Sequence, residues 1–373
     1  MTTALESPSL QMQTSLEKNP RTDPIDVDQT PIERTPESEI TRGSAMNIQD
    51  VADAAGVSKT TVSHVLSGNR PVSQATRDKV ERVMDELGFR PNFFAQALNS
   101  KRSHTVALIA QDITNPFYPA LARGLQAAVA PMNQVVMLFD AGAGDSLMRA
   151  FVNDVIQRRV DGVVVAVSNV EDKLLELQRS GIAVVAVGSG FSGFPIDWVS
   201  ADDERIGSDA TTHLHLKGHR RIATISGPPS AEPGTGRLAG YLKAMKELGL
   251  DSDSKLCAVG DWTRESGAAA LYRLLDQEVP PTAVFCANDL MAIGALDAAL
   301  ESGLSVPGDL AIVGVDDIDA ANLVRPGLTT VRIPAQDIGR AAGDLLLHRI
   351  AEQESTSHRH VLVQHSLISR QSV

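Results

Sequence analysis

The sequence predicts a small N-terminal all-α head followed by an α/β core of two lobes, each built on a doubly wound parallel sheet. In residues 46–91, apolar side chains recur at helical spacing between residues that begin and end helices. From residue 105 onward, near-continuous apolar runs alternate with amphipathic stretches, which is typical of parallel strands covered by helices on both faces. A chain of 373 residues has room for two or three such units.

Residues 1–45 differ from the rest in composition. They are rich in Pro, Thr, Ser and acidic residues and have no sustained hydrophobic period, which predicts a disordered acidic tail. Organised sequence begins near Met46, which is a second candidate for the translation start. The chain has neither a signal-peptide pattern nor an apolar run of membrane-spanning length, so we expect a cytoplasmic protein with no membrane partner.

Three short helices are expected in the head, residues 46–91. Each begins at a capping residue and ends at a glycine, in the pairs Asn47 and Gly56, Ser58 and Gly68, and Ser73 and Gly88. Three helices of this size share one modest core, which suits a helix-turn-helix unit.

The second of these helices lies in "VSKTTVSHVLSG", residues 57–68. Hydroxyl and β-branched residues crowd it, and both weaken helices. On a helix, Val62, Val65 and Leu66 fall on one side. The other side carries Lys59, Thr60, Ser63 and His64. Short donors and acceptors with one cation suit base edges and phosphates in a DNA major groove, whereas an ordinary solvated face is the alternative.

The charge is unevenly distributed along the chain. A net charge of −12 by itself argues against a nucleic-acid partner. Residues 46–104, however, hold eight Lys and Arg against six Asp and Glu, so this segment carries +2 and the remainder −14. Because binding depends on local charge, the asymmetry predicts one partner for the N-terminal part and another for the rest.

The core, residues 105–373, holds at least eight apolar runs. They are "TVALIA", "VVMLF", "VDGVVVAV", "IAVVAV", "RIATIS", "KLCAVG", "AVFCAN" and "LAIVGV". This number exceeds one comfortable sheet, so we expect two lobes with a ligand in the cleft between them, at the carboxyl ends of the strands. Cys257 and Cys286 lie in such runs and are expected to be buried thiols rather than a disulfide or metal pair.

Many ordered motifs resemble one known family. "NIQDVADAAGVSKTTVSHVLSGNRPVSQATRDKVERVMDELGFRPNFFAQAL" resembles the head of the lactose-repressor (LacI/GalR) family of bacterial transcription regulators, with its "GVS" turn and "TVS" recognition helix. "VALIAQDITNPFYPALARGLQ", "HLHLKGHRRIATISGP", "GRLAGYLKAM", "FCANDLMAIGAL", "IVGVDD" and "LTTVRIPAQDIGRAA" resemble its core. The resemblance covers residues 46 to about 370.

The resemblance assigns roles within the head. It implies that Lys59, Thr60 and His64 contact bases, and that a second set holds phosphates or orients the helix: Ser58, Thr61, Ser63, Asn69 and Arg70. Residues 92–104 correspond to the hinge helix and linker, where Leu98 would wedge into a minor-groove base step. The family usually has basic or small polar residues around that leucine. Gln96, Ala97 and Asn99 depart from this pattern, so we expect weaker phosphate contacts there.

Several residues of the core are candidates for binding a small-molecule effector. They are Asn115, Phe117, Tyr118, Arg237, Trp262, Asp289 and Asp316, with Asp317 as an alternative or addition to Asp316. Carboxylates, an arginine and aromatic rings suit a sugar or sugar derivative, and a purine or nucleoside is the alternative ligand. Each residue also has an ordinary structural alternative. Asn115 can cap the helix opened by Pro116, Phe117 can belong to the core, and Asp289 can cap the next helix.

Residues 188–197 depart from the family's sugar-binding pattern and also contain a glycine-rich motif. Many sugar-binding relatives have an Asp-Arg pair after the fourth strand, where this chain has Gly188 and Ser189, and nearby Asp197 is a candidate substitute. "GSGFSG" also matches a dinucleotide-binding pattern, but strand-like residues follow it instead of the required helix.

No Walker A pattern, metal-ligand cluster or nucleophile elbow is present in the sequence, and His213, His215 and His219 lie in a helix–turn–strand that resembles the family's. We therefore expect no enzyme activity, no cofactor and no metal.

The resulting hypothesis is a homodimeric regulator, with a tetramer as the larger alternative, that binds a pseudo-palindromic double-stranded operator and responds to an effector. One rival is a sugar-binding protein of the periplasmic-binding-protein-like fold, which shares the two lobes but lacks the helical head. The other is an NAD-linked enzyme, which rests on the glycine pattern alone.

Overall fold

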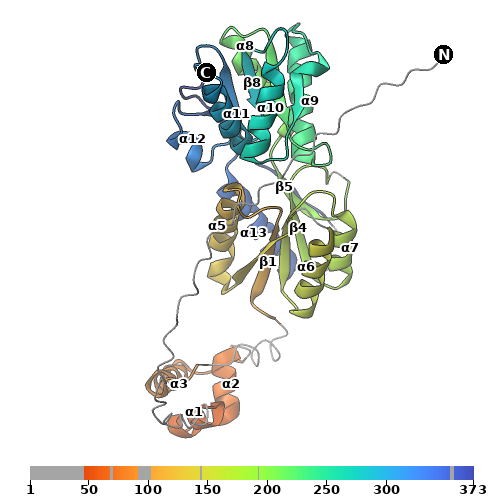
Figure 1. Ribbon diagram of the computed structural model, residues 1–373. Coiled ribbons are helices and arrows are strands. Elements are labelled where there is room, and N and C mark those ends of the chain that lie inside the picture. The colour runs from red at the N-terminus through yellow and green to blue at the C-terminus, as the bar shows by residue number, and fades with distance from the viewer. Residues whose placement is uncertain (1–45, 68–69, 91–101, 143–144, 192, 353–356) are drawn as a thin grey trace, which may run out of the picture.

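The computed structural model describes residues 46–67, 70–90, 102–142, 145–191, 193–352 and 357–373. Figure 1 shows a three-helix head and, apart from it, two lobes that follow one another. Within these ranges, no helix has both the length and the apolar character needed to cross a membrane.

The head consists of α1 (Ile48–Ala55), α2 (Lys59–Ser67) and α3 (Gln74–Leu87). The predicted caps are confirmed where they are described. Asn47 accepts hydrogen bonds from the backbone at the start of α1, and Ser58 and Ser73 do the same for α2 and α3. Gly56 and Gly88 end α1 and α3 at φ of 60° and 63°, values that favour glycine. The predicted stop at Gly68 lies outside the described residues.

The first lobe is a sheet of parallel strands in the order β11-β5-β4-β3-β1-β2. Its strands are β1 (Thr105–Ala110), β2 (Val135–Asp140), β3 (Gly162–Ala166), β4 (Ala183–Val187), β5 (Asp197–Ser200) and β11 (His360–Leu362). Its helices are α5 (Phe117–Val129), α6 (Asp145–Gln157), α7 (Glu171–Arg179) and α13 (Ala335–Ala351).

The second lobe repeats this arrangement in the order β12-β10-β9-β8-β6-β7. Its strands are β6 (Ile222–Ser226), β7 (Cys257–Val259), β8 (Ala283–Cys286), β9 (Ala311–Asp316), β10 (Thr329–Arg332) and β12 (Ser366–Ile368). Its helices are α8 (Asp203–Leu216), α9 (Glu232–Glu247), α10 (Arg264–Leu275), α11 (Asp289–Glu301) and α12 (Asp319–Leu323). The edge strand β12 runs antiparallel to β10. At this one edge, the sheet departs from the parallel arrangement that the sequence predicted.

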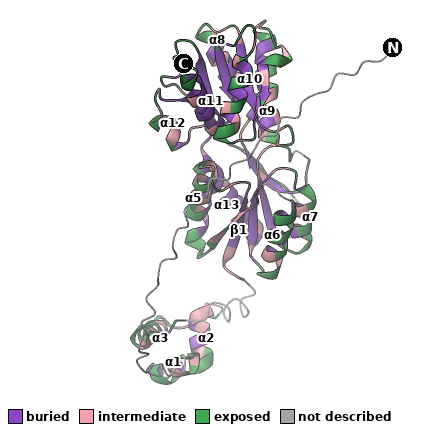
Figure 2. Ribbon diagram, viewed as in Figure 1, coloured by how far each residue is buried: buried purple, intermediate pink, exposed green. Residues whose placement is uncertain are grey.

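The inner strands of both lobes are buried, as their continuous apolar runs predicted, and Figure 2 shows them as the purple interior between green helix surfaces. The edge strands β2, β7, β11 and β12 are partly exposed, so the full burial predicted for β2 and β7 is wrong. Cys257 and Cys286 lie on β7 and β8 as free thiols, with β6 between the two strands. Cys286 is buried, whereas Cys257 is only half-buried.

The chain passes between the lobes three times. It leaves the first lobe after β5, returns to it between β10 and α13, and leaves it again between β11 and β12. Each lobe is therefore assembled from segments that are far apart in the sequence.

Within the second lobe, α8 and α9 approach each other closely through glycines. A Cβ atom on Gly207 would lie 2.0 Å from the carbonyl oxygen of Arg237, and one on Gly240 would lie 1.8 Å from that of Glu204. Both distances are far below van der Waals contact, so only glycine fits. This packing sets the position of Arg237, a predicted effector-site residue.

Candidate DNA-binding and effector sites

Helix α2 has the two faces predicted from its sequence. Val62 and Val65 are buried in the core of the head, and Leu66 packs against it. On the other side, Lys59 and Thr60 are exposed, and Ser63 and His64 are half-buried. The side chains predicted to contact bases are therefore accessible to a partner.

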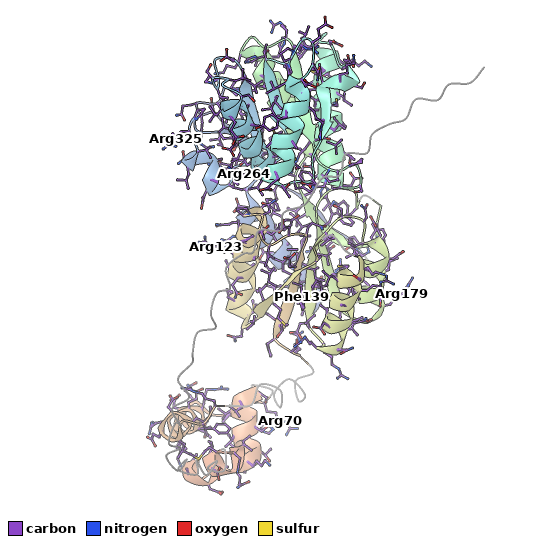
Figure 3. All side chains as sticks on the ribbon, in the orientation of Figure 1. Arg70, Arg123, Phe139, Arg179, Arg264 and Arg325 are labelled. Carbon is purple, nitrogen blue, oxygen red and sulfur yellow. The ribbon has the colours of Figure 1, made fainter. Side chains whose placement is uncertain are left out.

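The hydroxyls of Ser58 and Thr61 bond to each other at 2.8 Å, and the Thr61 N–H donates to Ser58 Oγ at 3.0 Å. These bonds hold the first turn of α2, and the phosphate-binding or helix-orienting role that the resemblance implied for both residues stays a prediction. The predicted phosphate contact Arg70 is exposed on the head, between α2 and α3 (Figure 3). Asn69 and Leu98, and the departures at Gln96, Ala97 and Asn99, lie outside the described residues.

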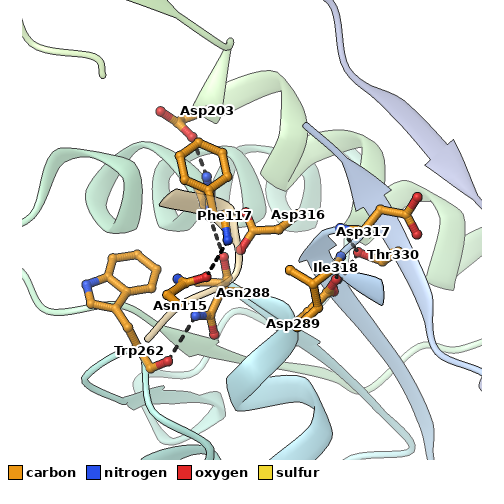
Figure 4. A network of polar contacts seen from close by, with 12 residues as sticks. Asn115, Phe117, Asp203, Trp262, Asn288, Asp289, Asp316, Asp317, Ile318 and Thr330 are labelled. Atoms are coloured by element: carbon orange, nitrogen blue, oxygen red, sulfur yellow. Dashed lines mark hydrogen bonds and ion pairs between the residues drawn. The ribbon is translucent and has the colours of Figure 1, made fainter. Parts of the chain in front are cut away.

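The predicted effector residues follow the carboxyl ends of parallel strands. Phe117 and Tyr118 come after β1, Trp262 after β7 and Asp289 after β8, whereas Asp316 ends β9. In a doubly wound sheet, this is the edge at which ligands bind. Figure 4 draws most of them in one view.

Arg237, on α9, lies at the centre of a buried polar network. Its Nε donates to Asp203 Oδ1 at 2.9 Å, and its Nη1 donates to the carbonyl oxygen of Ala287 and lies 4.0 Å from Asp316 Oδ1. The other oxygen of Asp203 accepts a hydrogen bond from the Ser189 hydroxyl. Because Ser189 belongs to the first lobe, the network joins the two lobes.

Asp203 was not predicted as a site residue. Its only sequence signal is its place in the acidic first turn of α8, where carboxylates are common in any helix. Asp197, which was a candidate for this position, is engaged elsewhere. Arg349 binds its two oxygens at 2.8 and 3.1 Å, and the backbone N–H of Arg359 donates to it at 2.7 Å.

Asp316 and Asp317 have different environments. Burial raises the pKa of Asp316 to about 7, although the Arg237 cation partly opposes this rise and the nearby Asp203 adds to it. Asp317 is held by Arg332 at 2.7 Å and by Arg370 at 2.6 Å. Asp316 is thus the carboxyl group that faces the Arg237 network.

The start of α5 brings two rings from the first lobe toward this network. The rings of Phe117 and Tyr118 meet edge to face at 5.4 Å. Burial raises the pKa of Tyr118 above its ordinary value, and the neighbouring carboxylate of Asp316 adds to this rise, which places Tyr118 near the second lobe's acid. The Asn115 side chain accepts a hydrogen bond from the Phe117 N–H at 3.0 Å. It therefore caps the start of the helix, which is the structural role considered for it as the alternative to ligand binding.

Trp262 lies against the loop after β6, because a Cβ atom on Gly227 would fall 2.3 Å from its ring. Its carbonyl oxygen accepts a hydrogen bond at 3.0 Å from Asn288, which also caps α11 through the Met291 N–H. The cap considered for Asp289 therefore belongs to the preceding residue.

Asp289 is fully buried, and both its oxygens have partners within the second lobe. Oδ1 accepts from the Thr330 hydroxyl at 2.6 Å and Oδ2 from the Ile318 N–H at 3.0 Å. Burial, followed by the charge of Asp316, raises its pKa well above the ordinary value. These contacts tie α11 to β10 and to the end of β9, and ligand contact by Asp289 stays a prediction.

The glycines of "GSGFSG" lie in a loop. Gly188, Gly190 and Gly193 have φ of 128°, 92° and 80°. The next element is strand β5, so no helix N-terminus follows to face a pyrophosphate. The expectation drawn from the sequence is confirmed.

Comparisons with known proteins agree with this architecture. Residues 47–92 match the model of bacterial regulatory proteins of the lacI family, and residues 211–373 match a periplasmic binding protein-like domain. The HTH-type transcriptional repressor CytR of Escherichia coli (strain K12) is 36% identical over 83% of this chain and 91% of its own length. The ribose operon repressor of the same organism is 36% identical over 82% and 93%.

Solved structures give the same result. A lac repressor dimer bound to operator and the anti-inducer ONPF has a TM-score of 0.78 at 27% identity, over 88% of this chain and 98% of its own. A complex of the transcriptional regulator CelR with cellobiose has a TM-score of 0.69 at 33% identity, over 88% and 100%. With its helix-turn-helix head, its two lobes and relatives that match it over most of their length, this chain belongs to the lacI family of bacterial regulatory proteins.

Proposed function

We propose that the chain represses transcription by binding a pseudo-palindromic operator as a homodimer, under the control of a small molecule held between its lobes. The observation that carries the proposal is the two-sided α2, buried at Val62 and Val65 and polar at Lys59, Thr60 and His64, in a chain of this family. Such a regulator acts on DNA in the cytoplasm.

In this proposal, α2 enters the major groove. Lys59, Thr60 and His64 contact base edges, while Ser58, Thr61, Ser63, Asn69 and Arg70 position the helix on the phosphates. Leu98 opens a minor-groove step near the centre of the site. Two heads bind half-sites about one helical turn apart, which explains why a dimer suits a pseudo-palindrome.

The effector is a sugar or sugar derivative. Support comes from the polar network of Ser189, Asp203, Arg237 and Asp316, which offers both acceptors and donors to hydroxyl groups, and from the nearby rings of Phe117 and Tyr118. Asn115 and Trp262 complete the proposed site. One relative is named a ribose operon repressor, and one neighbouring structure holds cellobiose.

A ligand bound to residues of both lobes favours one arrangement of the lobes over another. Differential binding of about 1–3 kcal/mol changes operator affinity by roughly 5- to 150-fold. The residues at the lobe junction therefore supply the sensing part of the regulator and α2 the DNA-binding part.

The first experiment tests DNA binding. The full chain is used to select duplexes from a random pool, and the affinity for the selected duplex is compared with that for a scrambled one. His64→Ala is expected to weaken binding of the selected duplex by about 1–3 kcal/mol and to relax preference at one position of each half-site. His348→Ala, an exposed position on α13, is the matched control. Equal affinity of the unaltered chain for both duplexes contradicts the proposal.

The second experiment tests the effector site. A thermal-shift screen of free sugars, sugar phosphates, nucleosides and purines identifies ligands that bind the native state, because such ligands raise the melting temperature. Asp316→Asn is expected to abolish the shift given by the best sugar and to leave binding of the selected duplex intact. A purine or nucleoside as the sole active compound contradicts the sugar assignment and leaves DNA binding standing.

A further inference from the structure

The entrance of the chain into the first lobe is held by one carboxylate. Asp161 Oδ1 accepts hydrogen bonds from the Ser103 N–H at 2.7 Å and from the Ser103 hydroxyl at 3.1 Å. Its Oδ2 accepts from the His104 N–H at 3.1 Å and from the Gln134 side-chain amide at 2.9 Å. Four donors therefore converge on one side chain.

The donors and Asp161 itself stand at the beginnings of three neighbouring strands. Ser103 and His104 precede β1, Gln134 precedes β2, and Asp161 itself precedes β3. Backbone bonds lock the same corner, because the Asp161 N–H donates to the Thr105 carbonyl at 2.8 Å and the Val135 N–H to that of His104 at 3.0 Å.

His104 has an unusual backbone conformation at this corner. Its φ of 46° lies in the left-handed region, which residues with a Cβ rarely adopt. Such a conformation persists when the surroundings over-determine it, as the bonds to Asp161 do here. It redirects the chain where it joins β1.

Strands β1 and β3 connect this corner to the junction between the lobes. They are parallel neighbours in the middle of the sheet, and Figure 1 shows β1 running through the first lobe toward the second. Beyond the end of β1 lie Phe117 and Tyr118 of the effector site. Beyond the end of β3, the Asn169 side chain donates a hydrogen bond to the carbonyl oxygen of Ser230 in the second lobe.

We propose that Asp161 is the positioning residue that couples the arrangement of the two lobes to the DNA-binding head, by fixing Ser103 and His104 to the first strands of the first lobe. The proposal rests on the proposed function. With Asp161 in place, a movement of the first lobe carries Ser103 and His104, the residues just before β1, with it. Without the Asp161 carboxylate, Ser103 and His104 lose its hydrogen bonds, and the movement of the lobe is transmitted to them less completely.

The test changes the arrangement of the lobes without a ligand. Asn169→Cys and Ser230→Cys are introduced into the full chain in a Cys257→Ser background and joined with a short bismaleimide. Cys286 is fully buried and does not compete. The affinity for the duplex selected by the unaltered chain is measured with and without the cross-link.

We expect the cross-link to change this affinity by at least about five-fold when Asp161 is present, a typical coupling for two linked sites. With Asp161→Ala, we expect less than about a two-fold change, and with Asp161→Asn, which keeps an acceptor for Ser103, an intermediate change. Amide hydrogen exchange at Ser103 and His104 should be at least about ten-fold faster in Asp161→Ala, because both amides lose their acceptor.

Asp154→Ala is the matched control, since it removes a carboxylate of the same lobe that pairs with Arg158 across an exposed turn of α6. It should respond to the cross-link as the parent does. An equal response in Asp161→Ala and its parent, or no response in either, overturns the coupling role while selective DNA binding stands. Loss of selectivity in the parent itself overturns the proposed function instead.

Discussion

The carboxylate of Asp289 offers a direct choice between a structural role and a ligand-binding role. Asp289→Ala leaves two buried donors without an acceptor, the Thr330 hydroxyl and the Ile318 N–H, which now bond to it at 2.6 and 3.0 Å. Each orphaned buried group costs about 1–3 kcal/mol, so the two together cost roughly 2–6 kcal/mol. The variant also removes a buried carboxyl group, whose burial itself costs free energy, so the expected net loss lies in the lower part of this range, about 2–4 kcal/mol.

Differential scanning calorimetry of the full chain measures this loss. One kcal/mol shifts the melting temperature of a domain of roughly 150–250 residues by about 2–4 °C, so the second lobe should melt about 4–16 °C lower. Asp289→Asn keeps an acceptor for the Ile318 N–H and should lose less than half as much. If Asp289→Ala melts as the parent does but loses the effector response, the structural role is refuted and direct contact between Asp289 and the ligand is favoured instead.

Three further predictions concern other parts of the molecule. The folded-state pKa of Asp316, about 7, lies above its ordinary value, so the native state holds this proton more tightly than the unfolded state does and the group's contribution to stability falls between about pH 4 and pH 7. The stability of Asp316→Asn relative to the parent should therefore rise across that window, by at most about 1.4 kcal/mol per pH unit in denaturant titrations, and a constant difference contradicts the assignment. Gly207→Ala places a Cβ 2.0 Å from the Arg237 carbonyl and should cost about 1–3 kcal/mol or more and weaken effector binding, whereas its half-buried neighbour Ser208→Ala should be nearly neutral by both measures. Ser58→Ala removes the cap of α2 and should destabilise the head by about 1 kcal/mol, so that a head as stable as the parent by hydrogen exchange in α2 contradicts the capping role.

Local patterns predicted the elements and the faces of the head well. Caps such as Asn47 and Ser73 act within three residues, and the apolar side of α2 follows from helical period alone. Most inner strands of the lobes were equally evident because a parallel strand buried on both faces is a continuous apolar run. In such cases the residues that predict a helix or strand are the residues that form it. The short strands β5, β10, β11 and β12 were not among the predicted runs.

The site was predictable only in part, because its contacts join distant segments. Arg237 and Asp316 were expected, but Asp203, which holds Arg237, looks like any acidic residue in the first turn of a helix. Ser189 and Asp203 meet across the lobes, and Asp289 meets Thr330 from 41 positions away. Asp161 likewise gathers donors about 58 and 27 positions away. No periodicity encodes such pairs, since only the assembled sheets bring them together.

The threefold passage between the lobes has a consequence for the order in which a nascent chain completes its parts. The first lobe needs α13, which packs on α5 so closely that a Cβ on Gly124 would lie 2.0 Å from the Gln336 carbonyl oxygen, and it also needs β11 at the edge of its sheet. Both leave the ribosome after every other described element of that lobe. The head, whose core lies entirely within residues 48–89, is finished far earlier. Truncated products that stop before α13 would therefore carry a finished DNA-binding module on an unfinished sensor.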